Sequence, residues 1–450
     1  MFEFANQLVL KVTKGCNLRC EYCYVKDKDE HEGEFIDFEL FKKVVDRIIE
    51  DKLKSGTTSK VFHITFHGGE PTTLDKGVFY KMCEYTQSKF NAVGIPLAFS
   101  IQTNLTLIDE EWCKLFSKFN VNVGASWDGI GNGNSARNNK STGFYLEKAA
   151  MLKRFNIRYG FLLVMNKHSL PYYEKSIQYF LKKFDSSTKA NYVEDVFTPI
   201  GQPSPIEISG HDFFNIVIKS EIDYFIKHGK TRETNTFDII NKFITDYLTN
   251  VGNYYSNRGN CYIKYCGSGL NIIELNPDGI VQLCGRYGDS NNEDTVLGNI
   301  LDEDFLSLKQ ITKHIEFTKS KIKAMNKSHC DNCLAQNICD HGCMAFYFSK
   351  TGQWGIRNDL TCTIFKPTYE YLLAHVNEII EAFFDEKLQK CGDTYYITLP
   401  SDKIAYFDIY VDKIKPLLNK HKIDISNDNS NLIFTKRGKN VKHSPNTSLQ

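Results

Sequence analysis

The alternation of two apolar patterns along the first 200 residues limits most strongly what this chain can fold into. Short apolar runs typical of buried strands occur at 7–13, 61–66, 97–102, 121–126, 159–165 and 192–200. Apolar residues at helical spacing lie between them, over 36–49, 75–90, 109–119, 144–155 and 170–184. Six β/α units in series predict an α/β fold with a parallel sheet, open or curved into a partial (β/α)6 barrel of the TIM type.

Composition limits the function classes. The chain has 450 residues, 42% hydrophobic and 24% charged, with a formal net charge of +1. This balance gives no sign of a nucleic-acid or membrane-surface partner. No stretch approaches the roughly 18 apolar residues of a membrane span, and the N-terminus does not resemble a secretory signal. We therefore expect a cytoplasmic protein, in which most of the fourteen cysteines bind metal rather than form disulfides.

Three cysteines lie directly after the first expected strand. Cys16, Cys20 and Cys23 fall within "GCNLRCEYCYVK", and no fourth cysteine is near. A structural zinc site or an ordinary iron–sulfur site uses four protein ligands, whereas three leave one coordination position open for chemistry.

Polar and glycine-rich stretches follow the next three expected strands. They are "FHGGEP" at 66–71, "QTN" at 102–104 and "SWDG" at 126–129. Because the loops at the carboxyl ends of barrel strands share one face, we expect these stretches to meet the three cysteines in space.

These motifs resemble those of the radical SAM superfamily. "CNLRCEYC" is similar to its C-x3-C-x2-C motif, with the aromatic Tyr22 before the last cysteine, and "GGEP" is similar to its second signature. The resemblance covers about residues 7–200. It implies that three thiolates hold a [4Fe-4S] cluster whose remaining iron position binds S-adenosylmethionine (SAM).

The resemblance also implies SAM contacts. Gly68 and Gly69 would let the backbone approach the methionine moiety, and Glu70 would fix the loop near the ammonium group. Ser126 and Arg137 match the residues that contact the polar groups of SAM, with Arg137 a partner for its carboxylate. Tyr22 and Asn104 complete the expected cofactor-binding set.

The later cysteines form a second pattern. Between Cys261 and Cys362 the chain becomes loop-rich, with eight cysteines in 102 positions and a hairpin expected to turn at Pro277–Gly279. This region resembles the SPASM extension of radical SAM enzymes. The resemblance implies one auxiliary [4Fe-4S] cluster on Cys261, Cys266, Cys284 and Cys343, and another on Cys330, Cys333, Cys339 and Cys362.

An alternative for the auxiliary cysteines, and the roles of the three remaining cysteines, stay open. The same eight ligands would also suit two zinc sites in a non-catalytic interaction protein. Cys83 and Cys113 lie on expected helices among apolar neighbours and should be buried small hydrophobes. Cys391 follows the bridging helix and is either an exposed thiol or a hydrogen donor.

The family resemblance implies reductive SAM cleavage to a 5′-deoxyadenosyl radical and hydrogen abstraction from a precursor peptide or protein side chain. It also implies an external electron donor, flavodoxin or ferredoxin. Anaerobic sulfatase-maturing enzymes carry an aspartate directly after the third inner-cluster cysteine, where it acts as a general base. Here Gly285 and Arg286 follow Cys284, and the nearest acid is Asp289. We therefore expect a thioether or carbon–carbon crosslink, with formylglycine formation as the alternative.

The expected organisation has five parts. They are a radical SAM core (1–202), a helical connector (203–258), a SPASM domain (259–370), a bridging helix (371–393) and a small αβ segment with a polar tail (394–450). The first strand begins near residue 7, which leaves no room for an N-terminal leader-binding domain. The strand "NLIFTK" near the C-terminus is expected to offer a free edge to the precursor peptide.

Overall fold

The fold is taken from a computed structural model. It describes residues 5–183 apart from 24, 26–28, 31, 59 and 138–139, and the later ranges 190–193, 205–229, 235–249, 268–269, 271–287 and 295–302. It further describes 305, 333–339, 343, 345, 359–390, 394–398, 418–419, 422–427 and 431–436. Cys261, Cys266, Cys330, Cys391 and Asp289 lie outside these residues.

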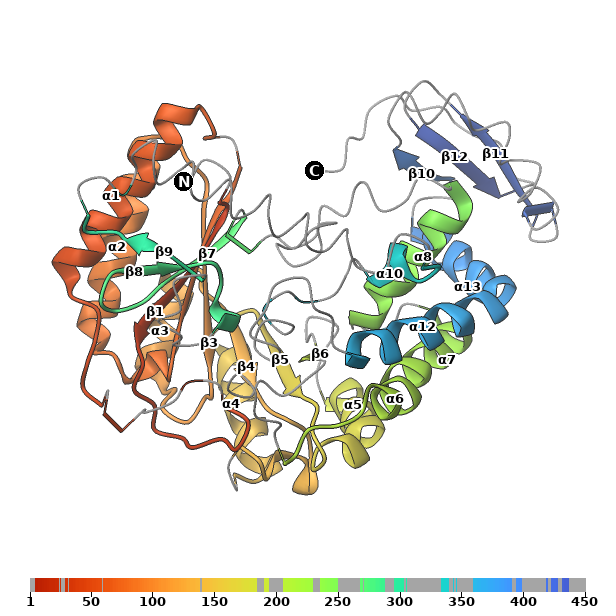
Figure 1. The fold of residues 1–450 in the computed structure, drawn as a ribbon, viewed down its shortest axis with the longest axis horizontal. Helices are drawn as coiled ribbons and strands as arrows, with labels where there is room; N and C mark the ends of the chain where they lie inside the picture. The colour runs from red at the N-terminus through yellow and green to blue at the C-terminus, as the bar shows by residue number, and fades with distance from the viewer. Residues whose placement is uncertain are drawn as a thin grey trace.

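A parallel sheet forms the first half of the molecule, as the sequence predicted (Figure 1). Its order is β6-β5-β4-β3-β2-β1, and each neighbouring pair is parallel. The strands are β1 (Gln7–Thr13), β2 (Phe62–Gly68), β3 (Leu97–Thr103), β4 (Asn122–Ser126), β5 (Tyr159–Val164) and β6 (Ala190–Val193). This arrangement is that of a partial TIM barrel.

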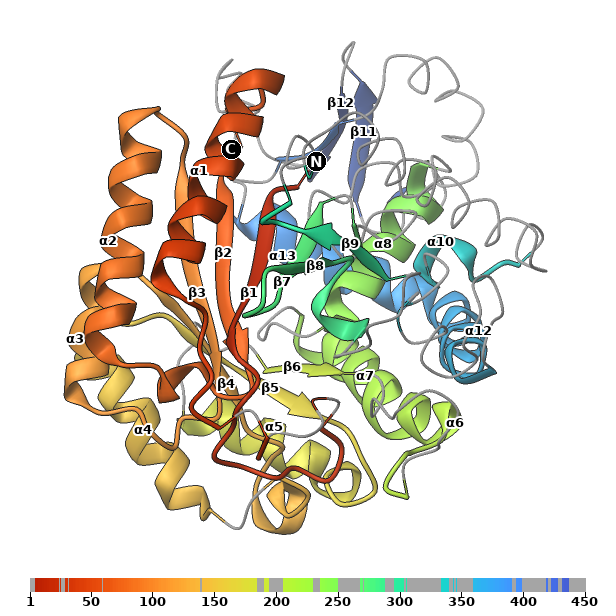
Figure 2. The ribbon, with the colours of Figure 1, turned by 60° about the vertical axis from the view of Figure 1, so that its left-hand side comes forward.

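Helices follow the first five strands and cover the outer side of the sheet (Figure 2). They are α1 (Phe38–Ser55), α2 (Lys76–Ala92), α3 (Glu110–Lys118), α4 (Thr142–Arg154) and α5 (Tyr173–Lys183). Asp37 is the N-cap of α1: it accepts a hydrogen bond from the Leu40 N–H at 3.0 Å, which satisfies one of the free donors of the first turn. Asp75, Asp109 and Ser141 cap α2, α3 and α4 in the same way.

The two faces of the sheet differ in polarity. Alternate residues of β1 and β2, such as Leu10 and Phe66, belong to the apolar core shared with the helices. The opposite face carries polar side chains that bond across strands, with Thr65 and Ser100 hydroxyls 2.8 Å apart and Gln102 Nε2 donating to Ser126 Oγ at 2.8 Å. The inner face of the partial barrel is therefore polar, and its side chains are hydrogen-bonded to one another across strands.

The hairpin expected in the cysteine-rich region is present. It comprises β7 (Ile272–Leu275) and β8 (Ile280–Gln282), and the Gly279 N–H donates to the Asn276 carbonyl at 3.0 Å across the turn. β7 pairs in parallel with β1, and β9 (Val296–Asn299) pairs with β8. The hairpin thus extends the core sheet to nine strands, an arrangement that the sequence did not indicate.

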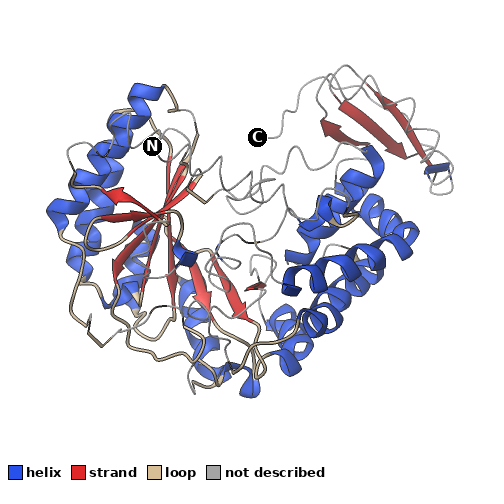
Figure 3. Ribbon diagram, viewed as in Figure 1, coloured by secondary structure: helices blue, strands red, loops and turns tan. Residues whose placement is uncertain are grey.

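A helical layer lies beyond β5 and β6 (Figure 3). It contains α6 (Gly210–Phe213), a π-helical turn (Phe214–Ile218), α7 (Lys219–His228), α8 (Asn235–Thr249), α10 (Gln336–Cys339), α12 (Asp359–Ala374) and α13 (Val376–Lys390). The expected bridging helix is therefore two helices, α12 and α13. Among the helices that the structure describes, none combines the length and apolar character needed to cross a bilayer.

The C-terminal part forms a separate three-stranded sheet. Its order is β10 (Thr394–Thr398), β12 (Asn431–Lys436) and β11 (Ile423–Asn427), all antiparallel. The prediction that "NLIFTK" has a free edge is wrong, because this segment is β12 and is paired on both sides. The sequence analysis missed β11, "IDISN", whose alternation of apolar and polar residues is short and bounded by polar loops.

Candidate active site at the carboxyl edge of the sheet

The three cysteines lie on the loop that leaves β1. Cys16, Cys20 and Cys23 form no disulfide and are of intermediate exposure. The Leu18 N–H points to Cys16 Sγ at 3.3 Å, a contact that favours a thiolate. Three soft sulfur donors on one loop suit an iron–sulfur cluster. Within the described residues, however, no three cysteine, histidine or acidic side chains lie close enough together to hold a metal ion.

The Gly-Gly-Glu-Pro stretch packs directly on the cysteine loop. The Gly69 N–H donates to the Thr13 carbonyl and the Glu70 N–H to the Gly15 carbonyl, both at 2.9 Å. A Cβ atom on Gly69 would lie 2.0 Å from the Gly15 oxygen, and one on Gly68 would lie 2.1 Å from the Thr13 oxygen. Both glycines are therefore required by backbone packing between the two loops, a reason that the motif alone did not reveal.

The buried Glu70 carboxylate organises this edge of the sheet. Oε1 accepts hydrogen bonds from the Thr72 hydroxyl at 2.5 Å and the Thr103 hydroxyl at 2.7 Å, and Oε2 accepts one from the Asn104 N–H at 2.7 Å. Burial raises the pKa of the Glu70 carboxyl, and these hydrogen bonds act in the opposite direction. Glu70 thus fixes the loop after β2 to the end of β3.

Asn104 continues this connection toward the cysteines. Its Nδ2 donates to Asn17 Oδ1 at 2.9 Å, and its Oδ1 accepts from the Thr106 N–H at 2.9 Å. Asn17 lies directly after Cys16, so the end of β3 is tied to the cysteine loop.

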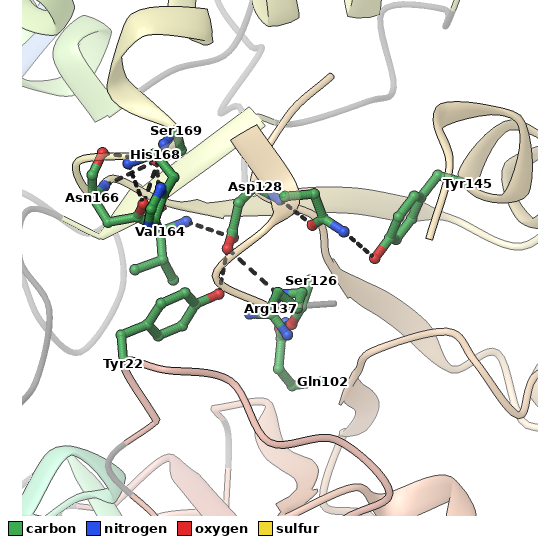
Figure 4. Close-up of polar contacts among 11 residues, drawn as sticks. Tyr22, Gln102, Ser126, Asp128, Arg137, Tyr145, Val164, Asn166, His168 and Ser169 are labelled. Carbon is green, nitrogen blue, oxygen red and sulfur yellow. Dashed lines mark hydrogen bonds and ion pairs between the residues drawn. The ribbon is translucent and has the colours of Figure 1, made fainter. Parts of the chain in front are cut away.

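The loop after β4 approaches the cysteines from the other side. The Glu21 N–H donates to the Ala136 carbonyl at 2.8 Å. Figure 4 shows Tyr22, Asp128 and Arg137 grouped together, with Ser126 beside them. The Tyr22 hydroxyl donates to Asp128 Oδ2 at 2.5 Å, and Arg137 Nε lies 3.6 Å from the same oxygen. Burial also raises the pKa of the Asp128 carboxyl, against the lowering effect of the Arg137 charge.

The expectation that four separated stretches meet in space is confirmed. The cysteine loop contacts the Gly-Gly-Glu-Pro stretch, Asn104 and the loop that bears Asp128 and Arg137. Cys83 and Cys113 are fully buried, as predicted. Cys284, Cys333, Cys339 and Cys343 are half-buried against the main core, and Cys362 lies on α12.

Four polar residues of this region were missed by the sequence analysis. Lys11 and Glu274 form an ion pair at 2.9 Å, with both side chains fully buried, between β1 and β7. His67 is opposite Lys11 in the β1–β2 register, and burial followed by the Lys11 charge lowers its pKa to about 4. The fourth is Asp128. Lys11 stands out as a charge within an apolar run, but its partner lies 263 residues further along the chain.

Comparisons with known proteins agree with this geometry. Residues 10–180 match the model of the Radical SAM superfamily. The cysteine-type anaerobic sulfatase-maturating enzyme of Clostridium perfringens is 24% identical over 81% of this chain and 95% of its own length.

Two solved structures share the fold. The structure described as native anSMEcpe with bound AdoMet and Kp18Cys peptide has a TM-score of 0.65 at 23% identity, and covers 84% of this chain and 98% of that one. Streptococcus suis SuiB bound to precursor peptide SuiA has a TM-score of 0.54 at 13% identity, with 80% and 76% covered. Residues 10–180 therefore form a domain of the Radical SAM superfamily, which indicates an enzyme that uses SAM, and the chain is similar over most of its length to the anaerobic sulfatase-maturating enzymes.

Proposed function

We propose that the chain is a radical SAM/SPASM maturase that oxidatively modifies a precursor peptide or protein side chain, forming a thioether or carbon–carbon crosslink. The convergence of the cysteine loop with three other strand-end loops carries this proposal. Relatives of the same fold are described with bound peptides, which supports a peptide substrate.

Different residues of the active-site edge would bind the cluster and SAM. Cys16, Cys20 and Cys23 would hold the SAM-binding [4Fe-4S] cluster. The bound cluster and SAM supply one-electron cleavage and a 5′-deoxyadenosyl radical. SAM would be bound and oriented by Gly68, Gly69, Glu70, Asn104, Ser126 and Arg137. Tyr22 would pack beside Arg137, since the Arg137 guanidinium carbon lies 5.5 Å from the centre of the Tyr22 ring.

Two auxiliary [4Fe-4S] clusters complete the proposed cofactors. Cys284, Cys333, Cys339, Cys343 and Cys362 support them, because these cysteines form no disulfide and are only partly buried, as cluster ligands at the margin of a core would be. An external flavodoxin or ferredoxin would deliver the electrons. We retain the division into a core (1–202) and a SPASM domain (259–370) as part of the proposal.

Formylglycine formation is the second candidate, favoured by the homology to the Clostridium perfringens enzyme. The residue after Cys284 argues against it. Gly285 has no side chain, and a Cβ atom there would lie 2.7 Å from Glu274 Oε2. An aspartate at position 285 would need the buried Glu274 carboxylate to move. A base supplied from that position is therefore not available in this chain.

The test uses anaerobically purified protein with SAM, dithionite and two sets of peptides. One set contains peptides encoded beside the gene, and the other contains 18-residue peptides with a central cysteine or serine. Mass spectrometry should show loss of two hydrogens with sulfur retained in the first set. In the second set, replacement of cysteine sulfur by oxygen together with loss of two hydrogens, or loss of two hydrogens from the serine peptide, would instead establish formylglycine formation. No change in any peptide would refute the proposal.

A further inference from the structure

Asp128 contacts three other residues of the active-site edge through one buried carboxylate. Its exposed fraction is 1%, and it lies two residues after Ser126. Oδ1 accepts a hydrogen bond from the Val164 N–H at 3.0 Å, at the end of β5. Oδ2 accepts one from Tyr22 in the cysteine loop at 2.5 Å and faces Arg137 Nε at 3.6 Å. Asp128 therefore lies between the cysteine loop and Arg137.

Arg137 is held on two sides but has donor capacity left. The side chain is 9% exposed, with the Tyr22 ring beside its guanidinium and Asp128 beside its Nε. The buried Nε has no hydrogen-bond partner among the residues that the structure describes. Nε is thus paired with Asp128 by charge at 3.6 Å without a hydrogen bond, and an anionic ligand beside the guanidinium would add a hydrogen-bond acceptor.

We propose that Asp128 is a positioning residue for SAM: it holds the Arg137 guanidinium in the orientation that binds the SAM carboxylate. This inference rests on the proposed role of Arg137. An arginine side chain loses much rotamer freedom when a ligand fixes it, and a preformed ion pair removes part of that cost before SAM arrives. A buried cation also needs a nearby anion in the absence of ligand, and Asp128 provides one.

A purely architectural role for Asp128 makes a different prediction. If the carboxylate only closes the loops after β4 and β5, its loss should weaken binding of every ligand of the site equally. If it acts through Arg137, its loss should weaken only ligands that carry the carboxylate. SAM and decarboxylated SAM differ in this group alone, so they separate the two roles.

The experiment measures both dissociation constants by equilibrium dialysis on anaerobic, cluster-loaded full-length protein. Asp128→Asn retains the shape and an acceptor for the Val164 N–H but removes the charge. Arg137→Ala tests the arginine itself. Asp46→Asn is the matched control. Asp46 also accepts a hydrogen bond from a tyrosine, Tyr85, and forms an ion pair with Lys89 at 2.9 Å, but it lies on the exposed surface of α1.

We expect Asp128→Asn to weaken SAM binding roughly 10- to 100-fold, as loss of a contact to a charged group does. Decarboxylated SAM should bind the variant as it binds wild type, and the Asp128→Asn/Arg137→Ala double variant should be no weaker than Arg137→Ala. Unchanged SAM binding by Asp128→Asn, or equal weakening of both ligands, would overturn the inference. If Arg137→Ala itself binds SAM normally, the assigned role of Arg137 fails and the inference with it.

Discussion

Single atoms decide how closely the loops of the active-site edge approach one another. The contact between Gly69 and Gly15 is the tightest example, because the Gly15 carbonyl occupies the place of a side chain at position 69. The motif "GGEP" indicated glycine from sequence, but the backbone partner became visible only in the structure.

Gly69→Ala should displace the cysteine loop. A Cβ atom 2.0 Å from a backbone oxygen cannot be accommodated by side-chain movement, so we expect at least about 1–3 kcal/mol of lost stability. Iron content and chemical denaturation under argon measure the effect. Gly143→Ala is the control, since its nearest neighbour would be Ser141 Oγ at 3.6 Å. Equal stability and iron content of the two variants would contradict this packing.

His67 gives the protein a pH dependence of known sign. Its pKa falls from 6.5 to about 4 on folding, so below pH 6.5 the unfolded chain binds a proton that the folded chain does not. Stability should therefore fall as the pH decreases from 7 to 5.5, by about 1 kcal/mol from this residue. His67→Gln should lose that part of the slope in denaturation measured under argon. Identical slopes for both proteins would show that His67 is not buried as described.

Sequence patterns predicted the residues of local motifs better than their long-range partners. Cys16, Cys20 and Cys23 are recognisable by spacing alone, and Glu70 by its neighbours. The contact between Tyr22 and Asp128 spans 106 positions, and no periodicity in the sequence links them. The predicted barrel indicated that these two loops meet, but not which side chains pair across them.

At the level of elements, the β7–β8 hairpin joins the core sheet through a buried ion pair. Lys11 on β1 and Glu274 on β7 are 2.9 Å apart, and neither is exposed to solvent. Because no solvent reaches this pair, we interpret it as a structural link. It fixes the hairpin that leads to Cys284 against the first strand of the barrel.

Removal of Lys11 should leave the buried Glu274 carboxylate without its cation at 2.9 Å. We expect Lys11→Met to lower the free energy of unfolding by about 3–5 kcal/mol. The Lys11→Met/Glu274→Leu double variant should recover most of this loss, since an apolar pair of similar volume avoids the desolvation cost. Denaturant titration of the three proteins provides the measurement. A single variant as stable as wild type would mean that the pair contributes nothing to the junction.

The sheet elements also show where sequence patterns failed. The six strands of the core were predictable because each is an apolar run that alternates with helical segments, although the last was expected at 192–200 and lies at Ala190–Val193. The segment "IDISN" is half polar and short, so β11 was missed, and β12 was wrongly given a free edge. Strand order in a small antiparallel sheet depends on pairing, which alternation alone does not specify.

For the whole molecule, the proposed function divides the cysteines into a SAM-binding set and an auxiliary set. Cys16→Ala, Cys20→Ala and Cys23→Ala together should remove one four-iron cluster and leave the others, lowering iron from roughly twelve to eight atoms per chain. Iron analysis of anaerobic protein tests the separation. Complete loss of iron would show that the clusters form only together.

The most direct test of the central claim is the release of 5′-deoxyadenosine from SAM under dithionite, measured by chromatography on anaerobic protein. Wild type and the Cys113→Ala control, altered at a buried thiol of α3, should release it, with or without the cognate peptide. The triple variant at Cys16, Cys20 and Cys23 should release none while remaining folded. Release by the triple variant at the wild-type rate, or none from wild type even with peptide, would contradict the assignment of the cysteine loop as the centre of SAM chemistry.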